Sequence, residues 1–389
     1  MPRGKVYLIS FGLILFCFTV SSAQIVSRCR PSPPLPKNPP RGVTGMSLSR
    51  DGKTLVSANA DGNIRIWNVA TGRVERTLTG HTNAIYNAVF SQNEKLLASS
   101  SRDLSARIWD VSTGRELFKF TGFKCSVKFV AFSPDGKMLA VVGNDGMLKL
   151  YDVKTGIELK SLVHTESPDV DISVYTVVFS KDGKMIYTGN GDGTISQWET
   201  KTGKEIKVWK AHNNNVSALT FDRNYRLLAS GGDMSDPVLR LWDTRTLREV
   251  SAFGEKRTEG LSEQLKPIAF SPNGKLIAAS VVGFDAKQRK YVYIRTYVWN
   301  VKTGKKLFTF EGHKFDVDAL VFTNDNRFLL TGSVDGTIKF WDLKTGGETR
   351  TFTVPKFESD RIQDIFDWRK PKNDELKAGI FCESILALL

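Results

Sequence analysis

Side chains that most often carry acid–base, nucleophilic or metal chemistry are sparse in this chain. It has four histidines, His81, His164, His212 and His313, and four cysteines, of which the three that follow the apolar N-terminal run stand far apart. No serine stands in a Gly-x-Ser-x-Gly turn, no stretch has the spacing of a phosphate loop, and no cysteine or histidine group has zinc spacing. Catalysis by histidine or by a bound metal is therefore not predicted, and no cofactor is expected.

Carboxylates and cations are the remaining chemical groups. The chain has 55 Lys and Arg against 41 Asp and Glu, a formal net charge of +14. Because the basic residues are spread without any long run, they indicate a solvated basic surface and disfavour specific nucleic-acid recognition. Electrostatic binding to an anionic polymer stays open as an alternative, with an affinity that would fall steeply with salt.

The N-terminus has the pattern of a secretory leader. Arg3 and Lys5 precede a fifteen-residue apolar run at 6–20, and Ser21, Ser22 and Ala23 then supply small residues for cleavage after Ala23. The run is shorter than the roughly 20 residues that span a bilayer, so no transmembrane span is expected after cleavage. The predicted location is secreted or periplasmic, or cytoplasmic if the leader is misread.

The chain divides into four predicted segments. A signal peptide at 1–23 is followed by a linker at 24–42, where six prolines favour an extended spacer, then by a repeat domain at 43–354 and a tail at 355–389. The cysteines that would remain after cleavage are Cys29, Cys125 and Cys382, which allow one disulfide and a free thiol.

The region from 43 to 354 is periodic at about forty residues. Short alternating segments such as 337–343 (TIKFWDL) have the period of half-buried strands, and Asp-Gly, Asn-Gly and Thr-Gly turns separate them. Seven repeats of four strands predict an all-β, seven-bladed β-propeller of four-stranded antiparallel blades. The aromatic that anchors each repeat is Trp67, Trp109, Tyr151, Trp198, Trp242, Trp299 or Trp341.

An aspartate stands six residues before the anchor aromatic in every repeat except the sixth, where Tyr293 takes its place. The Gly-rich stretch at 189–193 (GNGDG) contains one of these aspartates and is therefore assigned to a turn, not to a phosphate site. The outer strand of the last blade is expected at 347–354. The six aspartates are Asp61, Asp103, Asp145, Asp192, Asp236 and Asp335.

These repeats resemble the WD-repeat β-propeller family, with Trp-Asp at 109, 242 and 341. The resemblance implies that a histidine, a turn aspartate and the strand tryptophan form a buried hydrogen-bonded set with a structural role. It also implies a non-catalytic platform for a protein or peptide partner. The chain is expected to be a monomer. The three sets are His81, Asp103 and Trp109; His212, Asp236 and Trp242; and His313, Asp335 and Trp341.

Insertions interrupt the period only in blades four to six. The joints from Tyr151 to Phe179 and from Trp242 to Phe270 are 28 residues long instead of 23, blade five adds two residues near 234–237, and blade six adds ten around 283–293. In an up-and-down blade all these positions lie on one face, which carries the second-to-third turns and the blade-to-blade loops. Insertions on one face of a repeat protein often mark its binding face.

Basic and aromatic residues gather in two of these insertions, a composition suited to an acidic or peptide partner. An alternative is that the blade-six insertion only lengthens a β-hairpin and its lysines are solvated. A further alternative is an exported hydrolase or lyase with a carboxylate-based site in the central channel. The candidate partner-binding residues are Lys287, Arg289, Lys290, Tyr291 and Tyr293 in blade six, with Lys256 and Arg257 before it.

Overall fold

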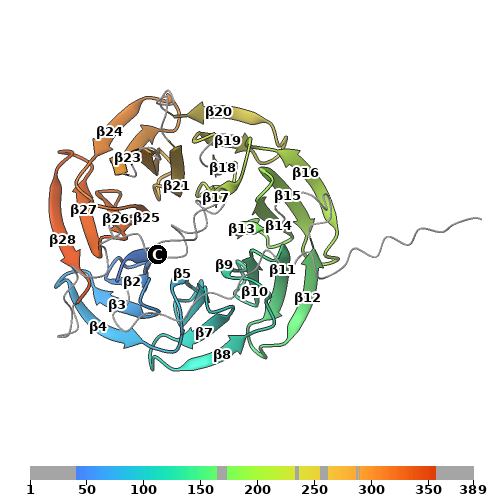
Figure 1. Cartoon of the computed structure of the whole chain (residues 1–389). Helices are drawn as coiled ribbons and strands as arrows, with labels where there is room; N and C mark the ends of the chain where they lie inside the picture. The colour runs from blue at the N-terminus through green and yellow to red at the C-terminus, as the bar shows by residue number, and fades with distance from the viewer. Residues whose placement is uncertain are drawn as a thin grey trace, which may run out of the picture.

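The computed structural model describes residues 41–163, 173–232, 236–254, 262–285, 288 and 290–355. These residues form 28 strands in seven four-stranded antiparallel sheets, arranged as blades around a common axis (Figure 1). Each sheet is built from four strands that are consecutive in the chain. The predicted seven-bladed propeller is confirmed. In the part of the chain that the structure describes, no helix has the length and apolar character needed to cross a membrane.

The strands of each blade run in chain order from the axis to the rim (Figure 1). Blades one to four comprise β1 Val43–Leu48, β2 Thr54–Asn59, β3 Ile64–Asn68, β4 Arg73–Leu78; β5 Ile85–Phe90, β6 Leu96–Ser101, β7 Ala106–Asp110, β8 Glu116–Phe120; β9 Val127–Phe132, β10 Met138–Gly143, β11 Met147–Asp152, β12 Glu158–Val163; and β13 Val174–Phe179, β14 Met185–Asn190, β15 Thr194–Glu199, β16 Glu205–Lys210. Blades five to seven comprise β17 Val216–Phe221, β18 Leu227–Gly232, β19 Leu239–Asp243, β20 Glu249–Phe253; β21 Ser262–Phe270, β22 Leu276–Asp285, β23 Lys290–Asn300, β24 Lys306–Phe310; and β25 Val317–Phe322, β26 Phe328–Ser333, β27 Thr337–Asp342, β28 Glu348–Thr353.

Two recurring turns reverse the chain on the face opposite the insertions. In the first-to-second turn of blade three, the Ser133 hydroxyl donates to Asp135 Oδ1 at 2.6 Å, and Gly136 has a φ of 71°. In the third-to-fourth turn, Asp152 caps the turn through its carboxylate and Gly156 has a φ of 73°. Both glycines occupy a left-handed backbone conformation that other residues adopt at a cost, so the turn sequences set the strand lengths.

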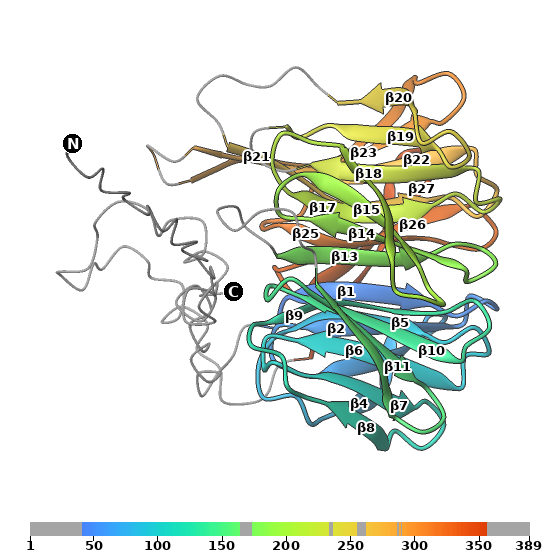
Figure 2. The same ribbon diagram turned by 90° about the vertical axis from the view of Figure 1, so that its right-hand side faces the viewer.

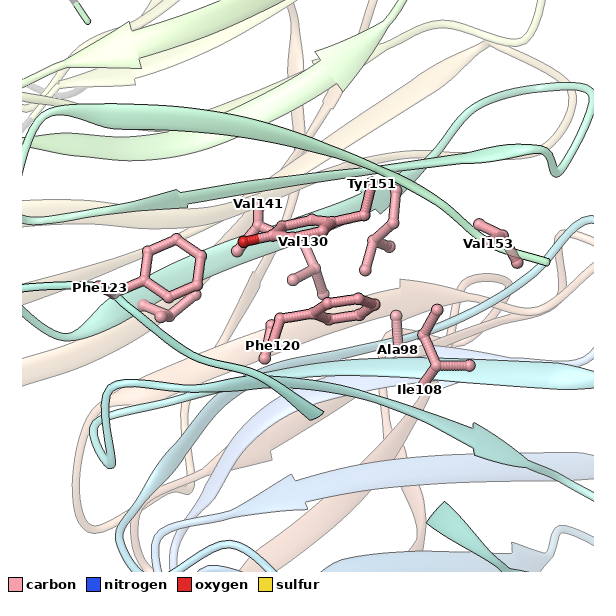
Figure 3. Packing of buried hydrophobic residues seen from close by; sticks show 11 residues of the cluster. Ala98, Ile108, Phe120, Phe123, Val130, Val141, Tyr151 and Val153 are labelled. Atoms are coloured by element: carbon pink, nitrogen blue, oxygen red, sulfur yellow. The ribbon is translucent and has the colours of Figure 1, made fainter. Parts of the chain in front are cut away.

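The hydrophobic core lies between neighbouring blades. Between blades two and three, the ring centroids of Phe120 and Tyr151 are 4.2 Å apart, and Ile108 and Val130 pack around them (Figure 3). The anchor aromatic of each repeat is buried in this way, which explains why the aromatic recurs once per blade. Burial of large aromatic surfaces between the sheets holds the blades together.

Blade seven meets blade one without exchanging a strand. Its outer strand is β28, which matches the expected segment at 347–354. The rings of Phe352 in β28 and Trp67 in β3 stack with centroids 5.8 Å apart. The Arg350 guanidinium donates to the carbonyls of Val69 and Ala70, both at 2.9 Å. Side-chain packing and hydrogen bonds between blades therefore close the ring.

Blade six departs from the regular plan. Its first three strands are nine, ten and eleven residues long, whereas the other strands have five or six. The pairing of β22 with β23 continues to Asp285 and Lys290, and β21 pairs with β22 as far as Ser262 and Phe284. The three strands project beyond one face of the ring (Figure 2). Part of the lengthened joint between Trp242 and Phe270 is therefore strand, because Ser262–Phe270 pairs with β22 as β21.

Candidate protein-binding face

The inserted face holds the candidate residues, but the structure describes only part of them. Lys256, Arg257, Lys287 and Arg289 lie outside the described residues, as do His164 and the tail beyond residue 355. Lys290 and Tyr291 belong to β23, although the structure does not describe their side chains. Tyr293 is the one member of the predicted set whose side-chain contacts can be given.

Tyr293 is held inside the extension of blade six. Its hydroxyl donates to Glu263 Oε1 at 2.6 Å, and the Arg295 guanidinium lies 4.6 Å from the centre of its ring. Glu263 is only 3% exposed, so the hydrogen bond from Tyr293 satisfies a buried carboxylate. A side chain at Gly283 would lie 2.6 Å from the tyrosine ring, so only glycine fits there. The extension is thus a packed three-stranded sheet.

Arg295 and Glu311 form an ion pair at the base of the extension. The Arg295 Nε atom lies 2.6 Å from Glu311 Oε1, and this hydrogen bond raises the pKa of Arg295 above its ordinary value. Both side chains are exposed enough for water to screen the pair, so its contribution to stability is small. Val292, farther out on β23, is 50% exposed.

The extension leaves one edge of β23 without a partner strand. Pairing between β23 and β24 covers only Thr296 to Trp299, starting with Thr296 opposite Phe310. From Lys290 to Arg295, β23 pairs with β22 on one side and with no strand of the described chain on the other. Alternate residues of this stretch therefore direct backbone N–H and C=O groups outward, as an edge strand does.

Within each of the three histidine sets, a hydroxyl group joins the histidine to the tryptophan. In blade two, His81 Nδ1 lies 2.8 Å from Asp103 Oδ2, and His81 Nε2 lies 2.8 Å from Ser99 Oγ. The Trp109 indole N–H donates to the same Ser99 oxygen at 2.9 Å. The aspartate and the tryptophan are therefore joined through histidine and serine and do not meet directly.

The same geometry recurs in blades five and seven. In blade seven, His313 contacts Asp335 at 3.0 Å and Thr331 at 2.7 Å, and Trp341 donates to Thr331 at 2.9 Å. The corresponding contacts in blade five link His212 to Asp236 at 3.2 Å and to Ser230 at 2.8 Å, and link Trp242 to Ser230 at 2.9 Å.

Sequence reasoning missed this hydroxyl residue, although a signal for it exists. Ser57, Ser99, Thr188 and Thr331 each stand ten residues before a tryptophan, and each accepts its indole N–H. Since a buried indole N–H needs an acceptor, a serine or threonine at that spacing marks the partner position on the neighbouring strand. It also missed Arg65, which contacts Asp61 at 2.6 Å in blade one, where no histidine is present in the set.

Electrostatics assign these sets a structural role. Burial alone would raise the pKa of Asp103, but hydrogen bonds from His81 and Ser105 hold the pKa of that carboxyl well below its usual range. Burial lowers the pKa of His81, so the imidazole is neutral at neutral pH. The side chain of His81 has no solvent exposure. A substrate could not reach it, and among the described residues no group of His, Cys, Asp and Glu gathers as a metal site.

Two families of known propeller proteins match the chain. Residues 304–342 match the WD domain, G-beta repeat, which together with the fold makes this protein a WD40-type propeller. Residues 42–280 match the IFT122 first beta-propeller, and because this match spans more than half of the chain, the chain belongs to that family. Neither match extends over the predicted leader.

Curated relatives resemble shorter parts of the chain. Protein tipD of Dictyostelium discoideum is 32% identical over 145 residues, which cover 37% of this chain and 21% of tipD. The Target of rapamycin complex subunit wat1 of Schizosaccharomyces pombe is 28% identical over 150 residues, covering 39% of this chain and 38% of the relative. Periodic tryptophan protein 2 of Arabidopsis thaliana is 33% identical over 117 residues, covering 30% and 11%. The matched parts are thus well under half of each relative.

Proposed function

We propose that this protein is a non-catalytic scaffold that binds a protein partner through the extension of blade six, formed by Ser262–Leu265, Val281–Asp285 and Lys290–Arg295. WD40 propellers typically act as non-catalytic scaffolds for other proteins. One relative, wat1, is by its name a subunit of a complex. Both support protein binding as the general activity, while the position of the binding surface is an inference from the geometry of blade six.

The observation that carries the proposal is the unpaired edge of β23 on a rigid support. The buried contact between Tyr293 and Glu263 holds β21 against β23, so the extension presents its edge at little cost in conformational entropy. An extended peptide can add to such an edge by main-chain hydrogen bonds, and exposed side chains such as Val292 then select its sequence.

A carboxylate-based enzyme has less support. The three histidines that the structure describes are held in structural networks, and the aspartates beside them are hydrogen bonded within the same networks. Binding of an extended polyanion also has less support, because the basic residues are spread through the sequence and form no long run. Binding of a protein is therefore the function that the geometry favours.

Affinity capture from the source organism tests the proposal. The intact chain is compared with a variant lacking residues 284–293, which restores the regular repeat spacing, after circular dichroism and thermal unfolding show that both fold. A matched pair of point variants follows: Val292→Asp on the extension and Val250→Asp on the outer strand β20, where the valine is similarly exposed at 55%. The proposal is supported if a partner is lost by the deletion variant and by Val292→Asp but is kept by Val250→Asp. It is contradicted if the deletion variant and Val292→Asp capture the same partners as the intact chain.

We further propose that the chain is exported. The apolar run at 6–20 with its small residues before Gln24 supports this. Export would also allow Cys125, which is buried, to pair with Cys29 or Cys382, because disulfides persist mainly in oxidising compartments. Mass spectrometry of the protein from its source, without reduction, is expected to find a chain starting at Gln24 and no free thiol at Cys125. An intact Met1 with a free Cys125 would contradict export.

A further inference from the structure

Two neighbouring inner strands bring an aromatic ring and a lysine together at the inserted face. Tyr86 is the second residue of β5, and Lys128 is the second residue of β9. The Lys128 ammonium lies 4.2 Å from the centre of the Tyr86 ring. Because inner strands begin where the blade-to-blade loops end, this contact lies on the same face as the extension of blade six.

Arg102 adds a second positive charge to this contact. Its backbone N–H donates to the carbonyl of Ala84 at 2.9 Å, which places Arg102 beside the start of β5. Burial alone would raise the pKa of Tyr86, but the charges of Lys128 and Arg102 outweigh burial and lower it. We call Tyr86, Arg102 and Lys128 the axial cluster.

Lys128 differs from the lysine at the same position of another inner strand. Lys266 in β21, like Lys128 in β9, follows a fully buried residue and lies at a break in strand register. Lys266 lies 3.8 Å from a carboxylate oxygen of Asp318. Lys128 is partly buried, yet it forms no ion pair with a carboxylate in the described part of the chain. A partly buried cation without a counter-charge attracts an anion more strongly than a cation that is already paired.

We propose that the axial cluster binds an anionic side chain, carboxylate or phosphate, of a protein partner. This inference rests on the proposed scaffold function and names the partner's chemistry. The Lys128 ammonium and the Tyr86 phenol can both donate hydrogen bonds to one oxyanion, and the bond from Lys128 is charge-assisted. A polyanion would need a longer track of unpaired basic residues, but Lys266 in β21 is already paired with Asp318. Strand β21 lies across the ring from β5 and β9 (Figure 1). The cluster therefore suits one anionic group on a peptide.

Fluorescence anisotropy with the full mature chain tests this site. The probes are a fluorescein-labelled peptide rich in aspartate and glutamate, the same peptide with phosphoserines in place of the acids, and its neutral asparagine and glutamine version. At least one anionic peptide is expected to bind more tightly than the neutral one. Whichever anionic peptide binds more tightly identifies the oxyanion.

Two lysine variants supply the matched comparison, since each removes one positive charge from the same strand position. Lys128→Gln is expected to weaken anionic-peptide binding about tenfold, whereas Lys266→Gln changes it less than twofold. Arg102→Gln is expected to act like Lys128→Gln. Thermal unfolding checks that all three variants fold.

Several results would overturn the inference. These are equal effects of the two lysine variants, binding of the neutral peptide as tight as that of the anionic ones, no binding of any probe, or a 20-nucleotide single-stranded DNA that binds more tightly than the anionic peptides and displaces them. These results would not affect the proposal that blade six binds a partner, because the capture experiment for that proposal depends on residues 284–293. If a partner is captured through blade six and Lys128→Gln does not weaken its binding, the scaffold function stands, but the axial cluster is not part of the binding site.

Discussion

Blades six and seven are neighbours with the same strand order, but they hold their third strand in different ways. Blade seven uses the network of His313, Asp335, Thr331 and Trp341. Blade six has Ala279 at the position of Thr331, according to strand register, and has Tyr293 in place of the turn aspartate. It has longer strands instead, with a buried hydrogen bond between the hydroxyls of Ser280 and Thr296 at 2.7 Å.

The difference shows how a repeat can change its outer shape without losing its fold. The polar network ties a short turn to the blade and goes with small changes in its length: Ser230 and Trp242 in blade five are two residues farther apart than Thr331 and Trp341 in blade seven. Once the aspartate is absent, the turn can lengthen into a hairpin, provided that added strand pairing replaces the lost contacts. Blade six therefore combines a stable inner sheet with a variable outer part, a common arrangement for a binding surface.

Breaking the network of blade seven is expected to have the largest effect. Asp335→Ala removes the acceptor for His313 and for the backbone N–H groups of Lys314 and Thr337. Because the side chains of His313 and Asp335 are only 3% and 8% exposed, the free energy of unfolding is expected to fall by about 2 to 4 kcal/mol. Urea unfolding measures this loss. A loss below about 1 kcal/mol would show that the network is not what holds the turn.

Acid is expected to weaken the same networks in two stages. The folded-state pKa of His81 and His212 lies below the ordinary value of 6.5 because both are buried, so the unfolded chain takes up their protons first and stability falls as the pH drops below about 6.5. Burial would raise the pKa of Asp335, but its hydrogen bond to His313 prevails and lowers it from 3.8 to about 2. Its contribution is present above pH 3.8 and is lost toward pH 2.

Urea midpoints between pH 8 and pH 3 test this profile. The intact chain is expected to lose stability from pH 6.5 downward, and more steeply below pH 4. Asp335→Asn is expected to reduce the second decline, since it removes one of the carboxylates that titrate there. A flat profile between pH 7 and pH 5.5 would contradict the assignment of neutral, buried histidines.

The extension of blade six is expected to be less sensitive. Tyr293→Phe removes the hydrogen bond to Glu263 but keeps the ring against Gly283 and Arg295. The expected loss is about 1 to 2 kcal/mol, because a buried carboxylate loses one of its donors. Urea unfolding of Tyr293→Phe and of Asp335→Ala under the same conditions compares the loss in free energy of unfolding in the two blades. A larger loss for Tyr293→Phe would reverse the comparison.

The smallest effect is expected at the outer strands. Lys339 and Glu348 form an ion pair at 2.7 Å in blade seven, whereas in blade six Lys306 lies 5.0 Å from the centre of the Tyr297 ring at the corresponding strands. Lys339→Met and Lys306→Met are each expected to cost less than about 1 kcal/mol. The loss in Lys339→Met should shrink in high salt. A salt-independent loss would assign the effect to packing of the lysine stem.

Much of the fold could be predicted from the chain because its repeats impose the same burial and turn requirements seven times. The aspartate and the aromatic that occupy the positions of Asp103 and Trp109 recur six residues apart in most repeats, a spacing that can be read from the sequence. The hydroxyl of Ser99 was missed because serine is common in turns and surfaces, and only the strand register shows that it faces the indole of Trp109.

The binding face could be predicted only in outline. Insertions are visible as changes in spacing, but whether added residues form strand or loop depends on pairing between distant segments, such as Ser262 opposite Phe284. The contact between Tyr86 and Lys128 likewise joins two repeats. The spacing of Tyr86 and Lys128 in the sequence does not predict this contact, because every repeat has some residue at the corresponding position of its inner strand.

Strand addition at β23 can be tested by hydrogen exchange of the backbone amides from Lys290 to Arg295, with and without the captured partner. If a peptide strand adds to the open edge of β23, the outward N–H groups of this stretch gain hydrogen-bond acceptors, and their exchange slows. Slower exchange is expected along this stretch, together with loss of binding in the variant lacking residues 284–293. Unchanged exchange along this stretch, with protection confined to other blades, would contradict strand addition at β23.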